Sequence, residues 1–172
     1  YNPCAAVDYP EARETERDIY TTEEVKTLLQ LLWDEGETRI PFAVFFTLAA
    51  YTGCRKGELL GLEWKDIDFV NQVVSIRRAY YYSSAEHTSY IDTPKTKKSQ
   101  RSLKLPTCVM DALHVLKEWQ NRHREQYCAS WIESDRLFTA ADGSPMRVSA
   151  PYTFLKSFIK RKGLRKATVH SF

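Results

Sequence analysis

The chain has 172 residues, of which 43% are hydrophobic and 27% are charged, ordinary values for a soluble globular protein. This length supports one domain with a substantial core and is short for two. No apolar run approaches the roughly 18 residues that a membrane-spanning helix requires, and residues 1–8 lack the pattern of a secretion signal. We therefore expect a cytoplasmic protein without a membrane partner.

The cysteines and the net charge give little indication of function, but the charge is unevenly distributed along the chain. Four separated cysteines form no CxxC pair, so we expect free thiols and no metal site. The net charge is only +3, yet residues 1–40 carry ten acids and four bases, which leaves +9 for the rest. Two acid-free basic clusters, at 95–104 and 156–166, suit a phosphate backbone. A solvated surface is the open alternative.

The first part of the chain predicts a linker followed by helices. Residues 1–20 are polar and are interpreted as a linker from an upstream domain. Thr21 and Glu24 form a capping box that should open a helix. Pro41 should start a second helix, buried over 42–51, and a short helix should follow at 56–61.

The middle of the chain predicts strands, and the last part returns to helices. A hairpin with a basic turn at 94–100 should belong to one small antiparallel sheet. Thr107 should cap a long helix, and a last amphipathic helix should end at Gly163. We predict an α+β, mainly helical domain with the sheet at one side, its strands at 66–69, 73–82, 90–93 and 101–105.

Three constellations carry candidate chemistry. Arg55 begins the short helix, where an anion would be favoured, and Glu58 lies one turn later to hold it. Lys95 lies on the basic hairpin, where an ammonium group suits proton donation to a leaving oxygen. His170 follows Thr168 and Val169 at the end of the chain. Taken singly, a surface Arg–Glu pair, a solvated loop and a structural histidine remain open interpretations.

Taken in order, the three constellations resemble the tyrosine recombinase family over about residues 18–172. The matching patterns are T-G-x-R-x-x-E-L-x-x-L, then W-x-D-I-D, then P-K-T-x-x-S-x-R, and a Thr-Val-His that enters an H-x-x-R box. The resemblance looks closest to integrases of conjugative transposons and related prophages. It implies the catalytic domain of that family over residues 21–172, and it implies that the linker 1–20 comes from an upstream core DNA-binding domain that is absent from this sequence.

The resemblance also implies a role for each matching residue. Arg55 corresponds to the first catalytic arginine, supported by Glu58, Lys95 to the hairpin lysine that protonates the leaving 5′ oxygen, and His170 to the box histidine. In the family, these groups activate a phosphodiester for attack by a tyrosine, without metal or cofactor. Further DNA contacts are expected from Lys56, Lys97, Lys98 and Arg101.

The match leaves two groups unaccounted for. The second arginine of the box would follow Phe172, and none of the ten tyrosines follows His170. We therefore expect this fragment alone not to cleave DNA. The full-length protein is expected to recombine double-stranded DNA as a homotetramer on two sites, with an accessory protein for excision, in the bacterial nucleoid.

Two alternatives compete with this interpretation. A non-catalytic DNA-binding module, or a relic of an integrase, would keep the basic hairpin without a nucleophile. A metal-dependent nuclease needs clustered acids, and Asp66 and Asp68 are too few.

Overall fold

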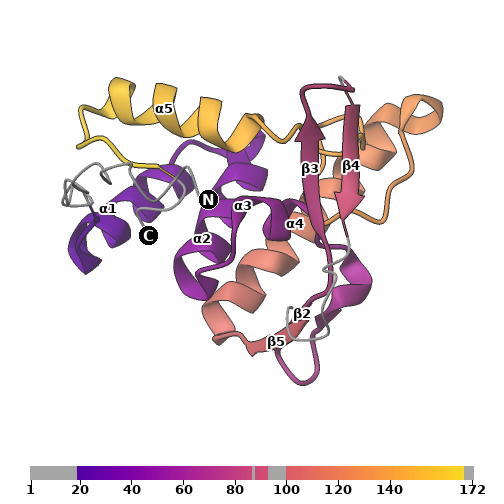
Figure 1. The fold of residues 1–172 in the computed structure, drawn as a ribbon, viewed down its shortest axis with the longest axis horizontal. Helices are drawn as coiled ribbons and strands as arrows, with labels where there is room; N and C mark the ends of the chain where they lie inside the picture. Colours follow the sequence, from indigo (N-terminus) through magenta and orange to yellow (C-terminus); the bar gives the residue numbers. More distant parts are fainter. Residues whose placement is uncertain (1–18, 87, 93–99, 169–172) are drawn as a thin grey trace, which may run out of the picture.

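The structure is a computed structural model, and it describes residues 19–86, 88–92 and 100–168. Figure 1 shows a helical body with strands at one side, which confirms the predicted α+β fold. Short 3₁₀ turns occur at Glu37–Arg39, Trp64–Asp66 and Cys128–Ser130. The α-helices are α1 (Thr22–Trp33), α2 (Ile40–Thr52), α3 (Lys56–Leu60), α4 (Thr107–Tyr127) and α5 (Ala150–Lys162). The strands are β1 (Ile67–Asp68), β2 (Val73–Ile76), β3 (Ala79–Ser83), β4 (Thr88–Asp92) and β5 (Arg101–Lys104).

Helix α2 forms the centre of the hydrophobic core. Its apolar residues leave no polar face, so it is buried between α1, α4 and α5. Phe45 and Phe46 are fully buried, and the Phe45 ring meets the edge of Phe138 with ring centroids 5.2 Å apart. The Phe42 ring stacks on Phe154 of α5 at 4.1 Å. Among the described residues, no helix is both long and apolar enough to cross a membrane.

The helix boundaries follow the sequence signals closely. The Thr21 side chain accepts a hydrogen bond from the Glu24 backbone N–H at 3.3 Å, and the Glu24 carboxylate accepts one from the Thr21 N–H at 2.7 Å. The predicted capping box is therefore confirmed. Helix α5 ends at Gly163 as predicted. Helix α4 differs slightly, because its N-cap is Pro106 and Thr107 is its first helical residue.

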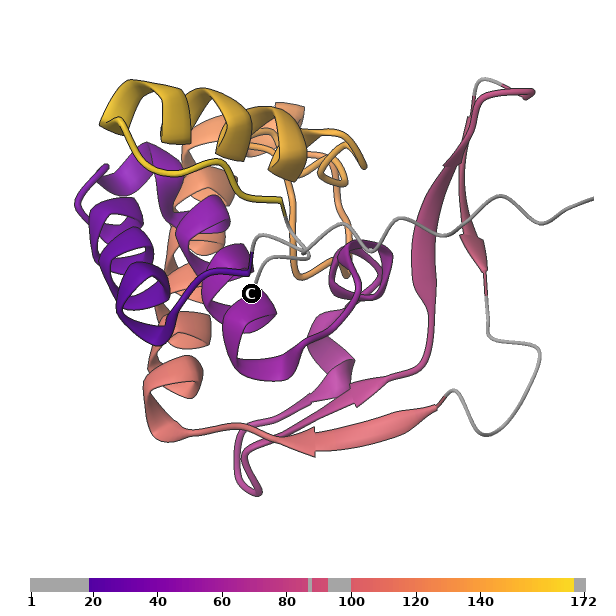
Figure 2. The ribbon, with the colours of Figure 1, turned by 60° about the vertical axis from the view of Figure 1, so that its left-hand side comes forward.

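The strands form a three-stranded antiparallel sheet and a two-stranded ribbon, where the sequence predicted a small antiparallel sheet and a hairpin. The expected arms of the hairpin, β4 and β5, pair with β3 and β2 and not with each other. One sheet has the order β1-β2-β5, and β3 pairs separately with β4 as a two-stranded antiparallel ribbon. The predicted strand 73–82 is broken at Arg77 and Arg78. Arg78 turns inward and ion-pairs with buried Asp66 at 2.6 Å and with Glu63 at 3.0 Å. Figure 2 shows the ribbon extending beyond the helical body.

Helix α3 packs closely against the β3 segment because it presents two glycines. A Cβ atom on Gly57 would lie 3.0 Å from the Tyr80 carbonyl oxygen. A Cβ atom on Gly61 would lie 2.9 Å from the Arg78 carbonyl oxygen and 3.0 Å from the Ala79 Cα. These neighbours are backbone atoms that cannot move aside cheaply, so the glycines fix the distance between α3 and the ribbon.

We predict that Gly61→Ala destabilises the domain by about 1–3 kcal/mol through overpacking. The backbone at Gly61 has an ordinary φ of −80°, so without the clash alanine would be neutral or stabilising. Denaturant midpoints of the two proteins measure the effect. Gly163→Ala is the control, because its φ of 65° would strain an alanine although its surroundings are open. It should lose about 1 kcal/mol from the backbone alone, without a steric clash. A more stable Gly61→Ala variant would contradict the close approach.

Candidate active site around Arg55

Arg55 occupies the turn between the buried helix α2 and the short helix α3. Helix α2 ends at Gly53, whose φ of 60° is a left-handed conformation that glycine adopts without strain. Arg55 is then the N-cap of α3, as predicted, and its side chain is 78% exposed. Helix α3 has only five residues, so the Arg55 guanidinium itself, and not the helix dipole, is the main source of positive charge at this site.

Glu58 is a buried carboxylate that lies between two arginines. Its side chain is only 10% exposed. One oxygen, Oε2, accepts a hydrogen bond from the Arg55 backbone N–H at 2.7 Å and another from Arg101 Nη2 at 2.9 Å. The other, Oε1, accepts one from Arg101 Nη1 at 3.0 Å. Arg101 thus binds Glu58 in a two-point arrangement, the strong geometry for an arginine and a carboxylate.

The guanidinium of Arg55 is held much less tightly. Its Nη1 lies 3.6 Å from Glu58 Oε1, which is an ion-pair distance and too long for a good hydrogen bond. Glu58 therefore fixes the backbone of Arg55, and the Arg55 side chain projects into solvent. The sequence analysis expected Glu58 to hold the guanidinium itself. The structure adds Arg101 as the main partner of this carboxylate.

The pKa of Glu58 is lower than that of an ordinary glutamate. Burial raises the pKa, because it penalises the charged form, but the hydrogen bonds from Arg101 and from the Arg55 N–H lower it by more. Both arginines also lower it through their charge. Glu58 is consequently ionised at neutral pH, and it keeps one negative charge beside two positive ones.

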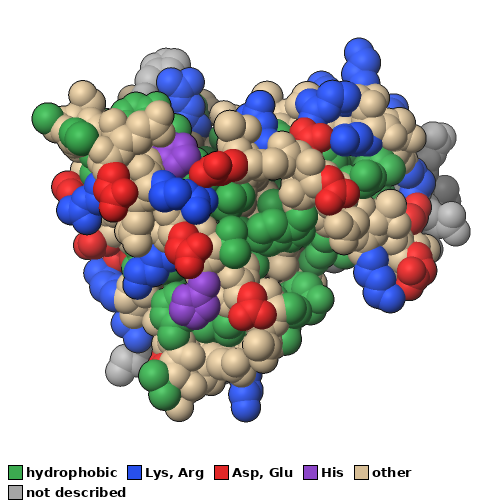
Figure 3. All heavy atoms as spheres, turned by 180° about the vertical axis from the view of Figure 1, so that it is seen from behind, with side chains coloured by type: hydrophobic (Ala, Val, Ile, Leu, Met, Phe, Trp, Pro, Cys, Tyr) green, Lys and Arg blue, Asp and Glu red, His purple; other side chains and the backbone are tan. Residues whose placement is uncertain are grey.

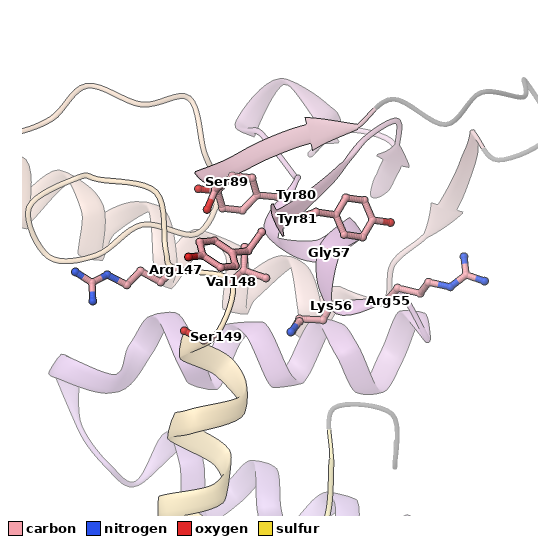
Figure 4. A pocket seen from close by; sticks show the side chains of 10 residues that line it. Arg55, Lys56, Gly57, Tyr80, Tyr81, Ser89, Arg147, Val148 and Ser149 are labelled. Atoms are coloured by element: carbon pink, nitrogen blue, oxygen red, sulfur yellow. The ribbon is translucent and has the colours of Figure 1, made fainter. Parts of the chain in front are cut away.

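A groove of about 770 Å³ opens beside Arg55. Figure 4 shows Arg55 and Arg147 at its two ends, with their side chains directed away from each other and with Lys56 between them. Tyrosines of β3 form the opposite wall. The groove thus combines three cationic side chains with aromatic ones, a mixture typical of nucleic-acid surfaces. Its lining comprises Arg55, Lys56, Gly57, Tyr80, Tyr81, Tyr82, Ser89, Arg147, Val148 and Ser149.

The predicted site residues are only partly within the described structure. Arg55, Glu58 and Arg101 lie together, and Lys56 lines the groove. The remaining ones lie outside the described residues, so their convergence with Arg55 stays a prediction; they are Lys95, Lys97, Lys98 and His170. Arg147 and Tyr81 also line the groove, and neither was predicted from the sequence. Arg147 precedes α5 in an irregular segment, and no periodicity or motif marks it.

The basic cluster at 156–166 is partly neutralised within the chain. Arg161 and Lys162 ion-pair with Glu35, the latter at 2.9 Å. Arg165 ion-pairs with Glu24 at 2.9 Å, and its hydrogen bond holds the pKa of Glu24 at about 2. These three cations therefore have acidic partners within the chain, Glu35 and Glu24, where the sequence left a phosphate backbone and a solvated surface as open interpretations of the cluster. Lys156, Lys160 and Lys166 are not in these pairs.

The face of the molecule opposite to that in Figure 1 carries side chains of both charges. Figure 3 shows acidic and basic side chains next to one another over the helical body. A surface that binds a phosphate backbone is expected to carry one sign of charge. That face therefore lacks the charge pattern of a DNA-binding surface.

Comparisons with known proteins agree with the fold. The chain matches the Phage integrase family over residues 19–172. It is 29% identical over 189 residues to a protein of Caldanaerobacter subterraneus named tyrosine recombinase XerC-like, covering 99% of this chain and 46% of that protein. It is 26% identical over 171 residues to the ICEBs1 integrase of Bacillus subtilis, covering 99% of this chain and 45% of that protein. It thus spans about half the length of these relatives.

Solved structures with the same fold include two that contain DNA. The Tn1549 transposon integrase, in complex with transposon right end DNA, has a TM-score of 0.69 and 22% identity, covering 92% of this chain and 51% of that one. The XerH site-specific recombinase bound to difH has a TM-score of 0.63 and 22% identity, covering 90% and 40%. At this identity the likeness shows the fold alone.

The fold and the family match together define a domain of the integrase class. The match over residues 19–172 is decisive. The chain belongs to the phage integrase family.

We predict that Glu58 makes the stability of the domain depend on acid. Because its folded pKa lies below the ordinary value of 4.5, its stabilising contribution is complete above that value and is lost as the pH falls through the folded pKa. The thermal unfolding temperature should therefore fall less between neutral and acid pH in Glu58→Gln than in the wild type. Exposed Glu118→Gln is the control and should follow the wild type. Parallel profiles for all three proteins would contradict this role.

Proposed function

We propose that this chain is the greater part of the catalytic domain of a site-specific DNA recombinase. The enzyme would cleave and rejoin DNA strands through a 3′-phosphotyrosyl intermediate, for the integration and excision of a mobile element. The observation that carries the proposal is the exposed guanidinium of Arg55, fixed at its backbone by buried Glu58 in a chain of the phage integrase family.

The chemistry requires an arginine at this place. When a tyrosine attacks a phosphodiester, negative charge gathers on the non-bridging oxygens of the phosphorus. An arginine guanidinium presents donors in a fixed fork that matches two oxygens of a phosphate. Preorganised donors of this kind are worth about 2.7–4 kcal/mol each in other enzymes. Since a phosphotyrosine bond keeps the energy of the broken bond, rejoining needs neither ATP nor a metal ion.

The other proposed groups rest on the resemblance of their motifs. Lys95 would give a proton to the leaving 5′ oxygen, and His170 would hydrogen-bond the phosphate. The second arginine and the nucleophilic tyrosine would follow Phe172. Lys56, which lines the groove beside Arg55, would contact the DNA backbone together with Lys97 and Lys98.

The proposed recombinase function also implies the partners of the protein. The substrate would be double-stranded DNA, since the similar Tn1549 and XerH structures contain DNA. The full-length protein would work as a homotetramer on two DNA sites in the bacterial nucleoid, with an accessory protein for excision. A non-catalytic DNA-binding role is the alternative, and it would leave DNA uncut.

We predict that Arg55→Ala abolishes cleavage but not DNA binding in the full-length protein that contains this chain. Arg55 is one of many contacts in the ground state, but it is one of few groups that meet the charge of the transition state. Loss of about 2.7–4 kcal/mol lowers the rate roughly 100- to 1000-fold. Covalent complex on a nicked suicide substrate measures cleavage, and fluorescence anisotropy measures binding. A wild-type protein that binds DNA and forms no covalent complex would instead favour the binding module.

We predict that Lys95→Ala and Arg55→Ala respond differently to a better leaving group. A 5′-bridging thiolate leaves without a proton, so it should restore much of the rate that Lys95→Ala loses. It should restore little for Arg55→Ala, because the charge on the non-bridging oxygens is unchanged. Cleavage rates of the thiolate and normal substrates give the comparison. Equal rescue of both variants would overturn the two roles.

We predict that neutralising Lys97 and Lys98 weakens binding to all duplex sequences alike. Each lost phosphate contact should reduce the slope of log affinity against log salt by about 0.9. The Lys97→Gln, Lys98→Gln variant should therefore lose nearly two units of slope in a titration over salt. Lys117→Gln on α4 is a control that removes a charge packed over Trp64. An unchanged slope in the double variant would contradict these contacts.

A further inference from the structure

The interaction between Arg101 and Glu58 has a use beyond holding the fold. Arg101 is the first residue of β5, and its register partner on β2 is Ile76. Both of its outer nitrogens are directed to Glu58, and Nη2 also lies 3.4 Å from the Cys54 sulfur. The side chain is 38% exposed. A guanidinium in this position has most of its donors directed into the protein, which is unlike an arginine that binds DNA.

The same contact determines how much of Arg55 is available. Glu58 cannot be buried without a countercharge, because an unpaired carboxylate in the interior is costly. The guanidinium groups of Arg55 and Arg101 compete for this carboxylate, and Arg101 donates hydrogen bonds to both of its oxygens, at 2.9 and 3.0 Å. The Arg55 guanidinium is left at 3.6 Å. Arg101 thus satisfies Glu58 and leaves the donors of Arg55 for another anion.

We propose that Arg101 is a positioning residue for cleavage, which acts by neutralising Glu58 so that Arg55 remains available to the phosphate. The proposal rests on the proposed recombinase function. It replaces the direct DNA contact that the sequence analysis expected of Arg101. Without Arg101, the buried carboxylate would draw the Arg55 guanidinium onto itself, and the phosphate would lose its partner.

The central test uses Arg101→Met in the full-length protein, with Lys104→Met as the matched control. Lys104 lies at the opposite end of β5, opposite Val73, so the control removes the same charge from the same strand. Arg101→Met should lower the rate of covalent complex formation roughly 10- to 100-fold. Its affinity for duplex DNA and its salt slope should match those of Lys104→Met. The contrary result is a slope of log affinity against log salt that is smaller in Arg101→Met than in Lys104→Met by about one unit, with normal cleavage of bound DNA. This result would make Arg101 a phosphate contact and overturn the proposal.

A second variant separates positioning from a general structural role. If Glu58 captures Arg55 when Arg101 is lost, then removing the charge of Glu58 should cost nothing more. The double variant Arg101→Met, Glu58→Gln should therefore cleave no more slowly than Arg101→Met alone, although Glu58→Gln by itself is slower than the wild type. If the cleavage rate of the double variant falls by the product of the two single-variant factors, the two residues act independently and the proposal is overturned. Arg101→Lys keeps the charge and can make one bond to Glu58, so its cleavage rate should lie between those of the wild type and Arg101→Met. This conservative variant keeps the test valid if the methionine variant misfolds.

The leaving-group experiment tells which catalytic group Arg101 serves. Because Arg101 acts through Glu58 on Arg55, the 5′-bridging thiolate should not rescue Arg101→Met. Rescue as large as that of Lys95→Ala would assign Arg101 to the lysine and overturn the proposal. The wild-type protein keeps the two hypotheses apart: no covalent complex from the wild type rejects the proposed function, whereas normal cleavage by Arg101→Met rejects only the role of Arg101.

Discussion

The burial of one carboxylate organises this site. Glu58 is removed from water, and a buried charge persists only when opposite charges and hydrogen bonds surround it. Its partners come from two places: the Arg55 backbone on its own helix and the Arg101 side chain 43 residues later. The need to satisfy Glu58 therefore brings the start of α3 to the start of β5.

A second constraint sets the shape of the groove. Gly57 and Gly61 let the backbone of the β3 segment approach α3 closely, and Arg136 donates a hydrogen bond to the Gly61 carbonyl at 3.0 Å. The ribbon is thereby fixed beside Arg55, so that its tyrosines form one wall of the groove. Elements on both sides thus fix the backbone of the residues that line the groove, whereas the Arg55 side chain projects into solvent.

The distribution of charge follows from competition inside the chain. A basic cluster in a sequence suggests an external anion, but acidic residues of the same chain can bind it first. Arg161, Lys162 and Arg165 pair with Glu24 and Glu35 across more than 120 residues of sequence. These pairs attach the end of α5 to the turn after α1, and the segment after α5 to α1. The groove beside Arg55 remains a cationic surface, with no acid among the described residues that line it.

The sequence by itself determined the helices, the fold class and the position of Arg55, because capping boxes, glycine stops and apolar periodicity are local signals. The T-G-x-R-x-x-E pattern located Arg55 and Glu58 together, since they are one helical turn apart. Only the tertiary structure decided the partner of Glu58, the break at Arg78 and the presence of Arg147 in the groove. Each of these depends on which distant side chain can reach a buried charge or a shared cavity, and no local pattern encodes that distance.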